Sequence, residues 1–169
     1  MTGHPFTLVD QNDAPVSSDD FDGQRIVVFF YPKAMTPGCT GEACDFRDRY
    51  DQFGEAGYAV VGISPDPPAA NAEFAAEHGL PFPLLSDPDH DVALRYGAWG
   101  TKRKFAEPGS TKYAVDRLRR AEDHGREYEG LIRSTFVLAP DHTIEHAWRN
   151  VRAKGHVARV ARDLGITEA

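Results

Sequence analysis

Two cysteines, Cys39 and Cys44, are the residues of this chain best suited to chemistry, and the chain has no others. The thiolate form of a cysteine is a strong nucleophile and a metal ligand. Thr36 and Pro37 stand just before Cys39, and threonine at an N-cap with proline at the first helical position is typical of a helix start. Cys39 is therefore expected in the first helical turn, where unpaired N–H groups and the helix dipole favour an anion. The pattern predicts a reactive cysteine.

The spacing of the two cysteines indicates how they could react with each other. On a regular helix, residues five apart are turned by about 140° and their Cα atoms lie about 8.7 Å apart. A disulfide requires Cα atoms within roughly 7 Å, so Cys39 and Cys44 can bond only if the helix between them unwinds. Gly41 lies between them and weakens a helix by about 1 kcal/mol relative to alanine. We interpret the pair as a redox couple that cycles between a wound and an unwound form. The alternative is two ordinary buried cysteines, which behave as small hydrophobic residues.

The stretch around Cys39 resembles the active-site motif of the peroxiredoxins, Pro-x-x-x-Thr-x-x-Cys, which Pro32, Thr36 and Cys39 supply. Within that superfamily, Thr-Pro-Gly-Cys-Thr-x-Glu-Ala-Cys is similar to the bacterioferritin-comigratory-protein (PrxQ) class, whose partner cysteine lies five residues further on. The resemblance covers most of the chain, including residues 133–136 and 148–156. It implies a thioredoxin-like α/β fold with a central mixed β-sheet flanked by helices on both faces.

The resemblance also implies an activity, that of a thiol-dependent peroxidase for hydrogen peroxide and organic hydroperoxides. Cys39 would attack the peroxide and become a sulfenic acid, which condenses readily with a nearby thiol. Cys44 would resolve it as a disulfide within one chain. An external dithiol, thioredoxin, would then restore both thiols by exchange. No metal, flavin or haem is expected to take part.

Further side chains should support the sulfur of Cys39. The Thr36 hydroxyl and the N–H groups of the first turn are expected to orient the peroxide. A cation should stabilise the departing oxygen, and the residues alone leave four candidates open: Lys33, Arg47, Arg49 and Arg133. The resemblance selects Arg133, which would otherwise be interpreted as a surface charge on a strand. It also implies that Pro32 shields the sulfur from water and that Glu42 orients Arg133, with a helix-surface charge as the alternative for Glu42.

Hydrophobic patterning predicts the elements that position these residues. Residues 25–31 form an almost unbroken apolar run, which suits a central strand covered on both faces. The helix after it is expected to extend to about Phe53, with Gly54 as its stop. The later expected elements are a strand at 58–63, a helix ending near His78, a strand at 83–86, a helix at 91–96, one strand over 131–138, a strand at 143–148 and a last helix at about 156–164. This alternation of strands and helices argues for an α/β sheet.

Bulk properties narrow the function classes. A chain of 169 residues fits one domain, 1–169. The net charge of −7 disfavours nucleic acid as a partner, and no apolar run is long enough to span a membrane. The first residues lack the features of a signal peptide, so we expect a cytoplasmic protein, where cysteines are more often catalytic than structural. The histidines lack metal-ligand spacing, and resolution within one chain favours a monomer.

Residues of about 102–125 depart from the family pattern and are expected to form a helical insertion. Residues 102–120 hold seven lysines and arginines against Glu107 and Asp116, so this stretch carries a charge of +5. A solvated basic face is the simpler interpretation. The alternative is a docking surface for an acidic partner or a second subunit.

Two other functions use similar features. A thioredoxin-type disulfide reductase or isomerase has the same fold but uses Cys-x-x-Cys, and the four residues between Cys39 and Cys44 argue against it. A redox sensor or holdase would use the same cysteine switch to expose a binding surface. Peroxide-dependent turnover would separate the peroxidase from both.

Overall fold

The structure is a computed structural model that describes residues 4–21, 23–103 and 127–166, with the backbone alone described at 101–103 and 127–129. Most of the expected insertion at 102–125 lies outside these residues. The strands are β1 (Thr7–Val9), β2 (Pro15–Ser17), β3 (Arg25–Phe30), β4 (Tyr58–Ser64), β5 (Leu84–Ser86), β6 (Trp99–Arg103), β7 (Glu127–Leu131), β8 (Ser134–Leu138) and β9 (Ile144–Trp148). The helices are the 3-10 helix η1 (Ser18–Phe21), α1 (Pro37–Asp48), α2 (Tyr50–Glu55), α3 (Pro68–His78), α4 (Asp91–Tyr96) and α6 (His156–Asp163).

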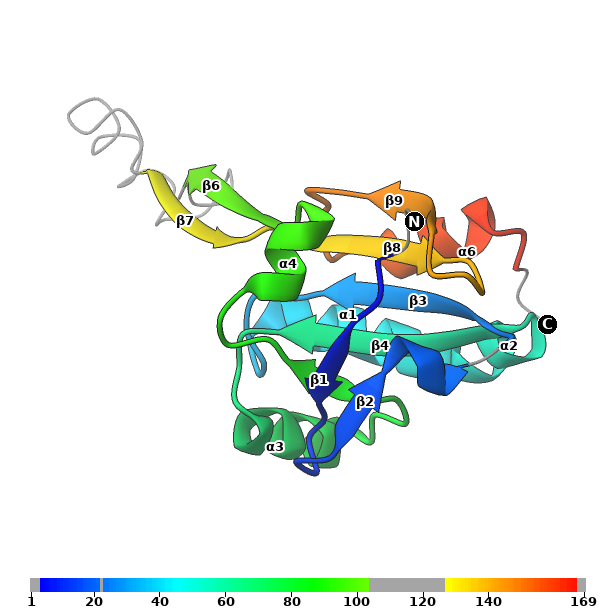
Figure 1. The fold of residues 1–169 in the computed structure, drawn as a ribbon, viewed down its shortest axis with the longest axis horizontal. Helices are drawn as coiled ribbons and strands as arrows, with labels where there is room; N and C mark the ends of the chain where they lie inside the picture. The colour runs from blue at the N-terminus through cyan, green and yellow to red at the C-terminus, as the bar shows by residue number, and fades with distance from the viewer. Residues whose placement is uncertain (1–3, 22, 104–126, 167–169) are drawn as a thin grey trace.

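Seven of the strands form one mixed sheet in the order β2-β1-β5-β4-β3-β8-β9. Strands β3, β4 and β5 are parallel to one another, while β8 is antiparallel to β3 and β9 is antiparallel to β8. Strands β6 and β7 pair only with each other and stand away from the main sheet (Figure 1). The expected mixed α/β sheet is confirmed. It places the end of β3, and therefore the loop that leads to Cys39, at the centre of the sheet.

The central strand β3 is buried on both faces, as its apolar run predicts. Val27, Phe29 and Tyr31 point into a core that includes residues of α1, α2, α3 and α6. Ile26, Val28 and Phe30 point into a second core on the opposite face, which includes residues of α4. This alternation follows from the two-residue period of a strand. Cys39 and its surroundings belong to the first core.

A close approach of side chains fixes how β3 and β4 are paired. Phe29 of β3 lies opposite Gly62 of β4. A Cβ atom at Gly62 would lie 2.8 Å from the Phe29 ring and 3.0 Å from both the Leu84 and Tyr31 side chains. Real Cβ atoms do not make contacts as short as 2.8 Å. Glycine is therefore required at this position because aromatic rings occupy the space of a side chain.

The expected helix from Cys39 to Phe53 is wrong, because the structure divides it into α1 and α2. Arg49 lies at the division with φ −108° and ψ 8°, and its N–H donates to the Phe46 carbonyl three residues back. Such an i→i+3 bond tightens and ends a helix.

The expected single strand over 131–138 is also wrong, because the chain passes there from one sheet to another. The N–H of Ile132 donates to the carbonyl of Ala98 beside the β6–β7 pair. From Ser134 onward the chain instead pairs with β3. Arg133 lies at the transition between the two sheets. Its side chain is therefore free of the strand alternation that a continuous strand would impose.

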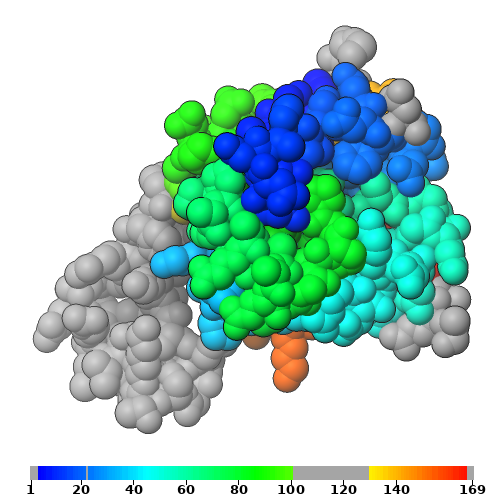
Figure 2. Space-filling view, turned by 90° about the horizontal axis from the view of Figure 1, so that it is seen from below, coloured from blue at the N-terminus to red at the C-terminus, as the bar shows by residue number. Residues whose placement is uncertain are grey.

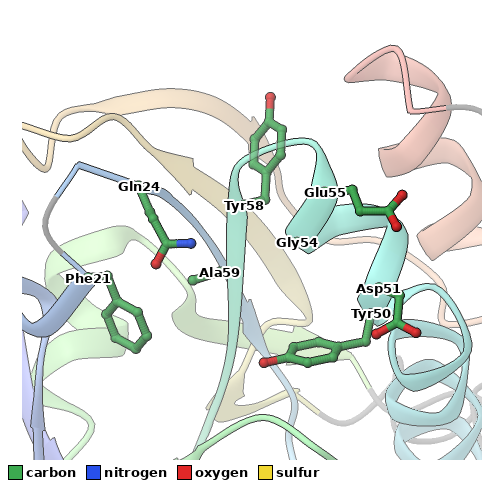
Figure 3. A pocket seen from close by; sticks show the side chains of 8 residues that line it. All are labelled: Phe21, Gln24, Tyr50, Asp51, Gly54, Glu55, Tyr58 and Ala59. Carbon is green, nitrogen blue, oxygen red and sulfur yellow. The ribbon is translucent and has the colours of Figure 1, made fainter.

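The N-terminal strands extend one side of the sheet, with β2 at its edge and β1 between β2 and β5. Figure 2 views the molecule from this side, where the blue N-terminal segment lies against the green part of the chain that includes α3. The contact follows from the antiparallel pairing of β1 with β5. A pocket of about 320 Å³ lies elsewhere, between the start of β4 and α2, with Phe21, Tyr50 and Tyr58 among its lining residues (Figure 3). It adjoins the amino-terminal ends of β3 and β4, whereas Cys39 follows the carboxyl end of β3, so this pocket is not part of the cysteine site.

Candidate active site

The loop after β3 places Cys39 in the first turn of α1, as the sequence predicts. Pro37 begins the helix and Thr36 occupies the N-cap position with extended backbone. The carbonyl of Thr36 accepts the N–H of Thr40 at 2.8 Å. The N–H groups of Gly38 and Cys39 therefore have no partner within the helix, and they are available to an anion beside the sulfur.

Thr36 stands at the expected N-cap position, but its side chain does not cap the helix. Its hydroxyl donates instead to the Lys33 carbonyl at 2.8 Å and makes no cap bond to α1. The hydroxyl is used to close the loop between β3 and α1. Because its proton points to Lys33, the oxygen of Thr36 keeps lone pairs that can accept a hydrogen bond from a bound molecule.

Arg133 is the candidate cation whose guanidinium contacts the Cys39 sulfur. Its Nη2 donates to Cys39 Sγ at 3.3 Å, although the two residues are 94 positions apart. Its Nη1 donates to Glu42 Oε1 at 2.7 Å. The Arg133 carbonyl accepts the N–H of Val151 at 3.0 Å, which holds the backbone of the arginine beside the loop before α6. The guanidinium thus bridges the sulfur and the carboxylate.

The other three candidate cations have different placements. Arg47 donates to the carbonyl of His78 in α3 and to its neighbour Asp48. Lys33 is exposed, and Arg49 lies at the break between α1 and α2. The ambiguity in the sequence is therefore resolved by the fold and not by proximity along the chain.

Glu42 is fully shielded from solvent, and this burial determines its electrostatics. Burial raises the pKa of Glu42 to about 7, while the charge and hydrogen bond of Arg133 act in the opposite direction. Its second oxygen, Oε2, has no hydrogen-bond partner among the described residues. Burial acts to lower the pKa of Arg133, but the charges of Glu42 and Cys39 more than offset it and the pKa is raised. The guanidinium therefore stays positively charged beside the sulfur.

Gly38 contributes to the site through close packing, a role that the sequence did not reveal. A Cβ atom at Gly38 would lie 3.2 Å from Arg133 Nη2 and 3.7 Å from the Cβ of Ala153. The space beside the first turn of α1 is thus filled by the guanidinium itself. A larger residue at position 38 would crowd the Arg133 guanidinium, which contacts Cys39.

A second set of polar contacts anchors the loop between β3 and α1. Asp66 Oδ2 accepts the N–H of Ala34 at 2.7 Å and the hydroxyl of Ser64 at 3.0 Å. The buried Tyr31 hydroxyl donates to Asn71 in α3 at 2.6 Å. Pro32, which was expected to shield the sulfur, lies half-buried in this loop. Asp66 could have been suspected from sequence, because it follows a strand that ends at the same edge of the sheet as β3.

A buried histidine, His156, lies close enough to Arg133 to interact with its charge. His156 Nε2 and the hydroxyl of Thr135 are 2.7 Å apart, and both side chains are almost inaccessible to solvent. Burial lowers the pKa of His156 to about 4, and the positive charges of Arg159 and Arg133 act in the same direction. This histidine is therefore neutral near pH 7, so it does not compete with Arg133 for negative charge.

Both cysteines are free thiols in the structure, with Cys39 buried and Cys44 partly buried. They lie in an intact α1. The structure thus corresponds to the reduced, wound form, in which the regular helical separation of the two residues is too long for a disulfide.

The described residues hold no cluster of metal ligands and no helix that could span a membrane. Within residues 4–21, 23–103 and 127–166, no three histidine, cysteine, aspartate or glutamate residues gather closely enough to hold a metal ion. In the same part of the chain, no helix combines the length and the apolar character needed to cross a bilayer.

Comparison with known proteins gives one consistent family. Residues 3–147 match the model of the AhpC/TSA family. A Mycobacterium tuberculosis relative that is classed with the peroxiredoxins is 46% identical over 161 residues, which are 95% of this chain and 90% of its own. Peroxiredoxin Bcp of Escherichia coli is 40% identical over 151 residues, 89% of this chain and 85% of its own. The structure of the Xanthomonas campestris bacterioferritin comigratory protein superposes with a TM-score of 0.78 at 29% identity, covering 95% of this chain and 90% of that one.

Proposed function

Since this chain belongs to the AhpC/TSA family and is a thiol peroxidase of the Bcp/PrxQ type of peroxiredoxin, we propose that Cys39 attacks the peroxide and Cys44 resolves the product. The observation that supports this assignment is the 3.3 Å contact between Arg133 Nη2 and Cys39 Sγ. It joins a thiol at a helix N-terminus to a permanent cation, and both features favour the thiolate, which is the nucleophilic form.

In the first step, the Cys39 thiolate attacks one peroxide oxygen. An S–O bond forms, the O–O bond breaks, and the departing oxygen takes a proton to leave as water or an alcohol. Negative charge develops on that oxygen, so donors fixed near it lower the barrier. The N–H groups of Gly38 and Cys39 and the Arg133 guanidinium supply these donors. The Thr36 oxygen accepts a hydrogen bond from the peroxide O–H, because its own proton is donated to the Lys33 carbonyl.

In the second step, the thiol of Cys44 attacks the sulfenic sulfur of Cys39. The S–S bond forms, the S–O bond breaks, and the hydroxyl group leaves as water with the proton of the thiol. The sulfurs meet only if α1 unwinds locally, which separates Glu42 and Cys39 from Arg133. The resulting disulfide lies within one chain, so this cycle needs no second subunit and we expect a monomer.

The disulfide is then reduced by an external dithiol, for which thioredoxin is our proposal. Thiol–disulfide exchange returns two electrons and restores both thiols. This recycling suits a reducing compartment such as the cytoplasm. Organic hydroperoxides are expected substrates beside hydrogen peroxide, because the X. campestris relative is described by its alkyl peroxide reduction activity.

The proposal is tested by peroxide-dependent NADPH oxidation in the presence of thioredoxin and thioredoxin reductase. We expect turnover with the wild type, none with Cys39→Ser, and a single equivalent of peroxide consumed by Cys44→Ser without recycling. Peptide mapping of the oxidised wild type should find a Cys39–Cys44 disulfide. Full thioredoxin-dependent turnover by Cys44→Ser would contradict the resolving role, and turnover by Cys39→Ser would contradict the assignment of the nucleophile.

A further inference from the structure

Arg47, in the last turn of α1, fastens this helix to α3. Its Nη1 donates a 2.7 Å hydrogen bond to the carbonyl of His78, the last residue of α3. The final carbonyls of a helix lack intrahelical partners and carry partial negative charge, so a cation there is bonded and also attracted by the helix dipole. Arg47 Nε donates to Asp48 Oδ1 at 3.0 Å, which fixes the direction of the guanidinium.

The carbonyl that Arg47 contacts belongs to a firmly packed helix. The fully buried Asn71 of α3 accepts the hydroxyl of Tyr31 at 2.6 Å. Phe74, also buried, places its ring 5.9 Å from the Tyr31 ring. After His78, Gly79 ends α3 in the left-handed conformation with φ 59°. α3 is therefore a fixed point against which α1 can be held.

The residue before Arg47 is anchored as well, by apolar packing. The Phe46 ring is stacked on Phe29 of β3, with centroids 4.6 Å apart and planes inclined by 25°. Neither ring is accessible to solvent. Replacing a buried phenylalanine in such packing by alanine is strongly destabilising. The C-terminal turn of α1 is thus held by both a polar and an apolar anchor.

The N-terminal part of α1 is held differently. Its polar anchor is the pair of Glu42 and Arg133, and Glu42 lies between the two cysteines. Any unwinding that brings Cys44 to Cys39 changes the backbone at Glu42 and disturbs this pair. Phe46 and Arg47 follow Cys44, so unwinding that extends past Cys44 must also disrupt their contacts with Phe29 and His78. Resolution therefore disturbs the anchor in the N-terminal part of α1 each time, whereas the anchors in its last turn limit how far the helix unwinds.

We propose that Arg47 is a positioning residue that fixes the C-terminal boundary of the segment that unwinds during resolution. By tying α1 to α3 it stabilises the wound helix, and so it sets how often Cys44 can approach the Cys39 sulfenic acid. This inference rests on the proposed function, because it presupposes a disulfide between these two cysteines. It adds a residue whose hydrogen bonds go to His78 and Asp48 and whose charge is close enough to interact with Cys44.

The test is Arg47→Ala, followed by rapid quenching and alkylation after one equivalent of hydrogen peroxide. Disulfide formation should be faster than in the wild type, by up to about tenfold, because a hydrogen bond from a charged group no longer opposes unwinding. The sulfinic form of Cys39 at high peroxide should decrease, since resolution competes with further oxidation. Amide hydrogens of residues 43–48 should exchange faster. The rate constant for the attack of Cys39 on the peroxide should change little, because the contact of Arg133 with the Cys39 sulfur is kept.

Arg95→Ala is the matched control. Arg95 Nη1 donates to the Pro5 carbonyl at 2.9 Å, and its side chain is 41% exposed against 36% for Arg47. The control removes an arginine–carbonyl bond of the same kind, outside α1, and should leave the rate of disulfide formation unchanged. Arg47→Lys keeps the charge with fewer donors and should give an intermediate rate. Gly41→Ala, which strengthens the helix, should slow disulfide formation.

Each result bears on the proposal. Acceleration in Arg47→Ala but not in Arg95→Ala supports it. An unchanged or slower rate in both Arg47 variants, or equal acceleration in Arg95→Ala, overturns it and leaves the proposed function intact. If oxidised wild-type protein contains no Cys39–Cys44 disulfide, the proposed function itself fails, and the role of Arg47 fails with it.

Discussion

Arg133 and Glu42 form an ion pair from which solvent is largely excluded: Nη1 lies 2.7 Å from Oε1, and the two side chains are 15% and 0% exposed. The other nitrogen of the same guanidinium faces the Cys39 sulfur. The carboxylate thus fixes one edge of the planar guanidinium and directs the second edge at the thiol. A lysine cannot do both in this geometry, because its ammonium has no planar fork.

Replacing Arg133 should slow the first step specifically. We expect Arg133→Met to lower the rate constant for hydrogen peroxide by about 100-fold or more, since removal of one preorganised donor typically costs that much. Arg133→Lys should lose less, because a positive charge remains. Competition with a reference peroxidase measures this rate constant. A rate in Arg133→Met equal to that of the wild type would exclude the guanidinium from the chemistry.

Gly38→Ala should have a similar but smaller effect. The new Cβ would lie 3.2 Å from Arg133 Nη2, so the guanidinium must shift by a few tenths of an ångström, which disturbs its contact with the sulfur. We expect a loss of about tenfold in the first step, because misplacement by about 1 Å can cost up to 100-fold. Gly41→Ala is the control, since a Cβ there meets nothing within 4 Å. Equal first-step rates in the two variants would show that the packing at Gly38 is irrelevant to catalysis.

The raised pKa of the buried Glu42 should make the folding stability depend on pH. Its pKa in the folded protein is raised to about 7 from 4.5, with burial as the main cause. The folded state therefore retains a proton that the unfolded state has lost, and this contribution to stability disappears as pH rises from 4.5 through 7. In Glu42→Gln this decline should be absent. Melting temperatures measured across this range for both proteins test it, and identical slopes would contradict it.

His156 should make the folding stability depend on pH in the opposite direction. Its pKa is lowered to about 4 from 6.5, chiefly by burial, so the unfolded state takes up a proton before the folded state does. Stability from this group is complete above pH 6.5 and decreases as pH falls toward 4. The melting temperature of His156→Gln should therefore fall with rising pH between 4.5 and 6.5, whereas that of Glu42→Gln should rise. The wild-type curve should be flatter than either, and a steep wild-type curve would argue against this compensation.

The sequence was most informative where structure depends on near neighbours. The helix start at Pro37 and the apolar run of β3 depend on local sterics and on burial, so Cys39 could be placed at a helix N-terminus without coordinates. The break at Arg49 could not be anticipated, because the apolar stripe of α1 continues into α2 with helical spacing and hides it. The strand break beside Arg133 was missed for a different reason. It depends on Ile132 pairing with Ala98, a distant residue.

The residues of the site also show that contacts between distant parts of the chain are hard to predict from sequence. Cys39, Cys44 and Thr36 are adjacent in sequence and could be grouped by spacing alone. Choosing Arg133 over Lys33, Arg47 and Arg49 required either the family resemblance or the fold, because 94 positions separate it from the sulfur. Gly38 acts through its contact with Arg133, which no pattern in its own neighbourhood reveals, whereas the place of Asp66 after a strand gave a hint of its contact with Ala34.

The glycine opposite Phe29 has a consequence for the whole molecule. A strand that is apolar on both sides could slide by a residue along its neighbour with little change in burial, so hydrophobicity alone does not set its alignment. The missing side chain at Gly62 forms a notch that accepts the Phe29 ring in a single alignment. That fit aligns β3 with β4, and Cys39 follows the end of β3. A methyl group introduced at Gly62 would collide with the Phe29 and Tyr31 rings, which share a core with Cys39, and would be expected to misplace the chemistry.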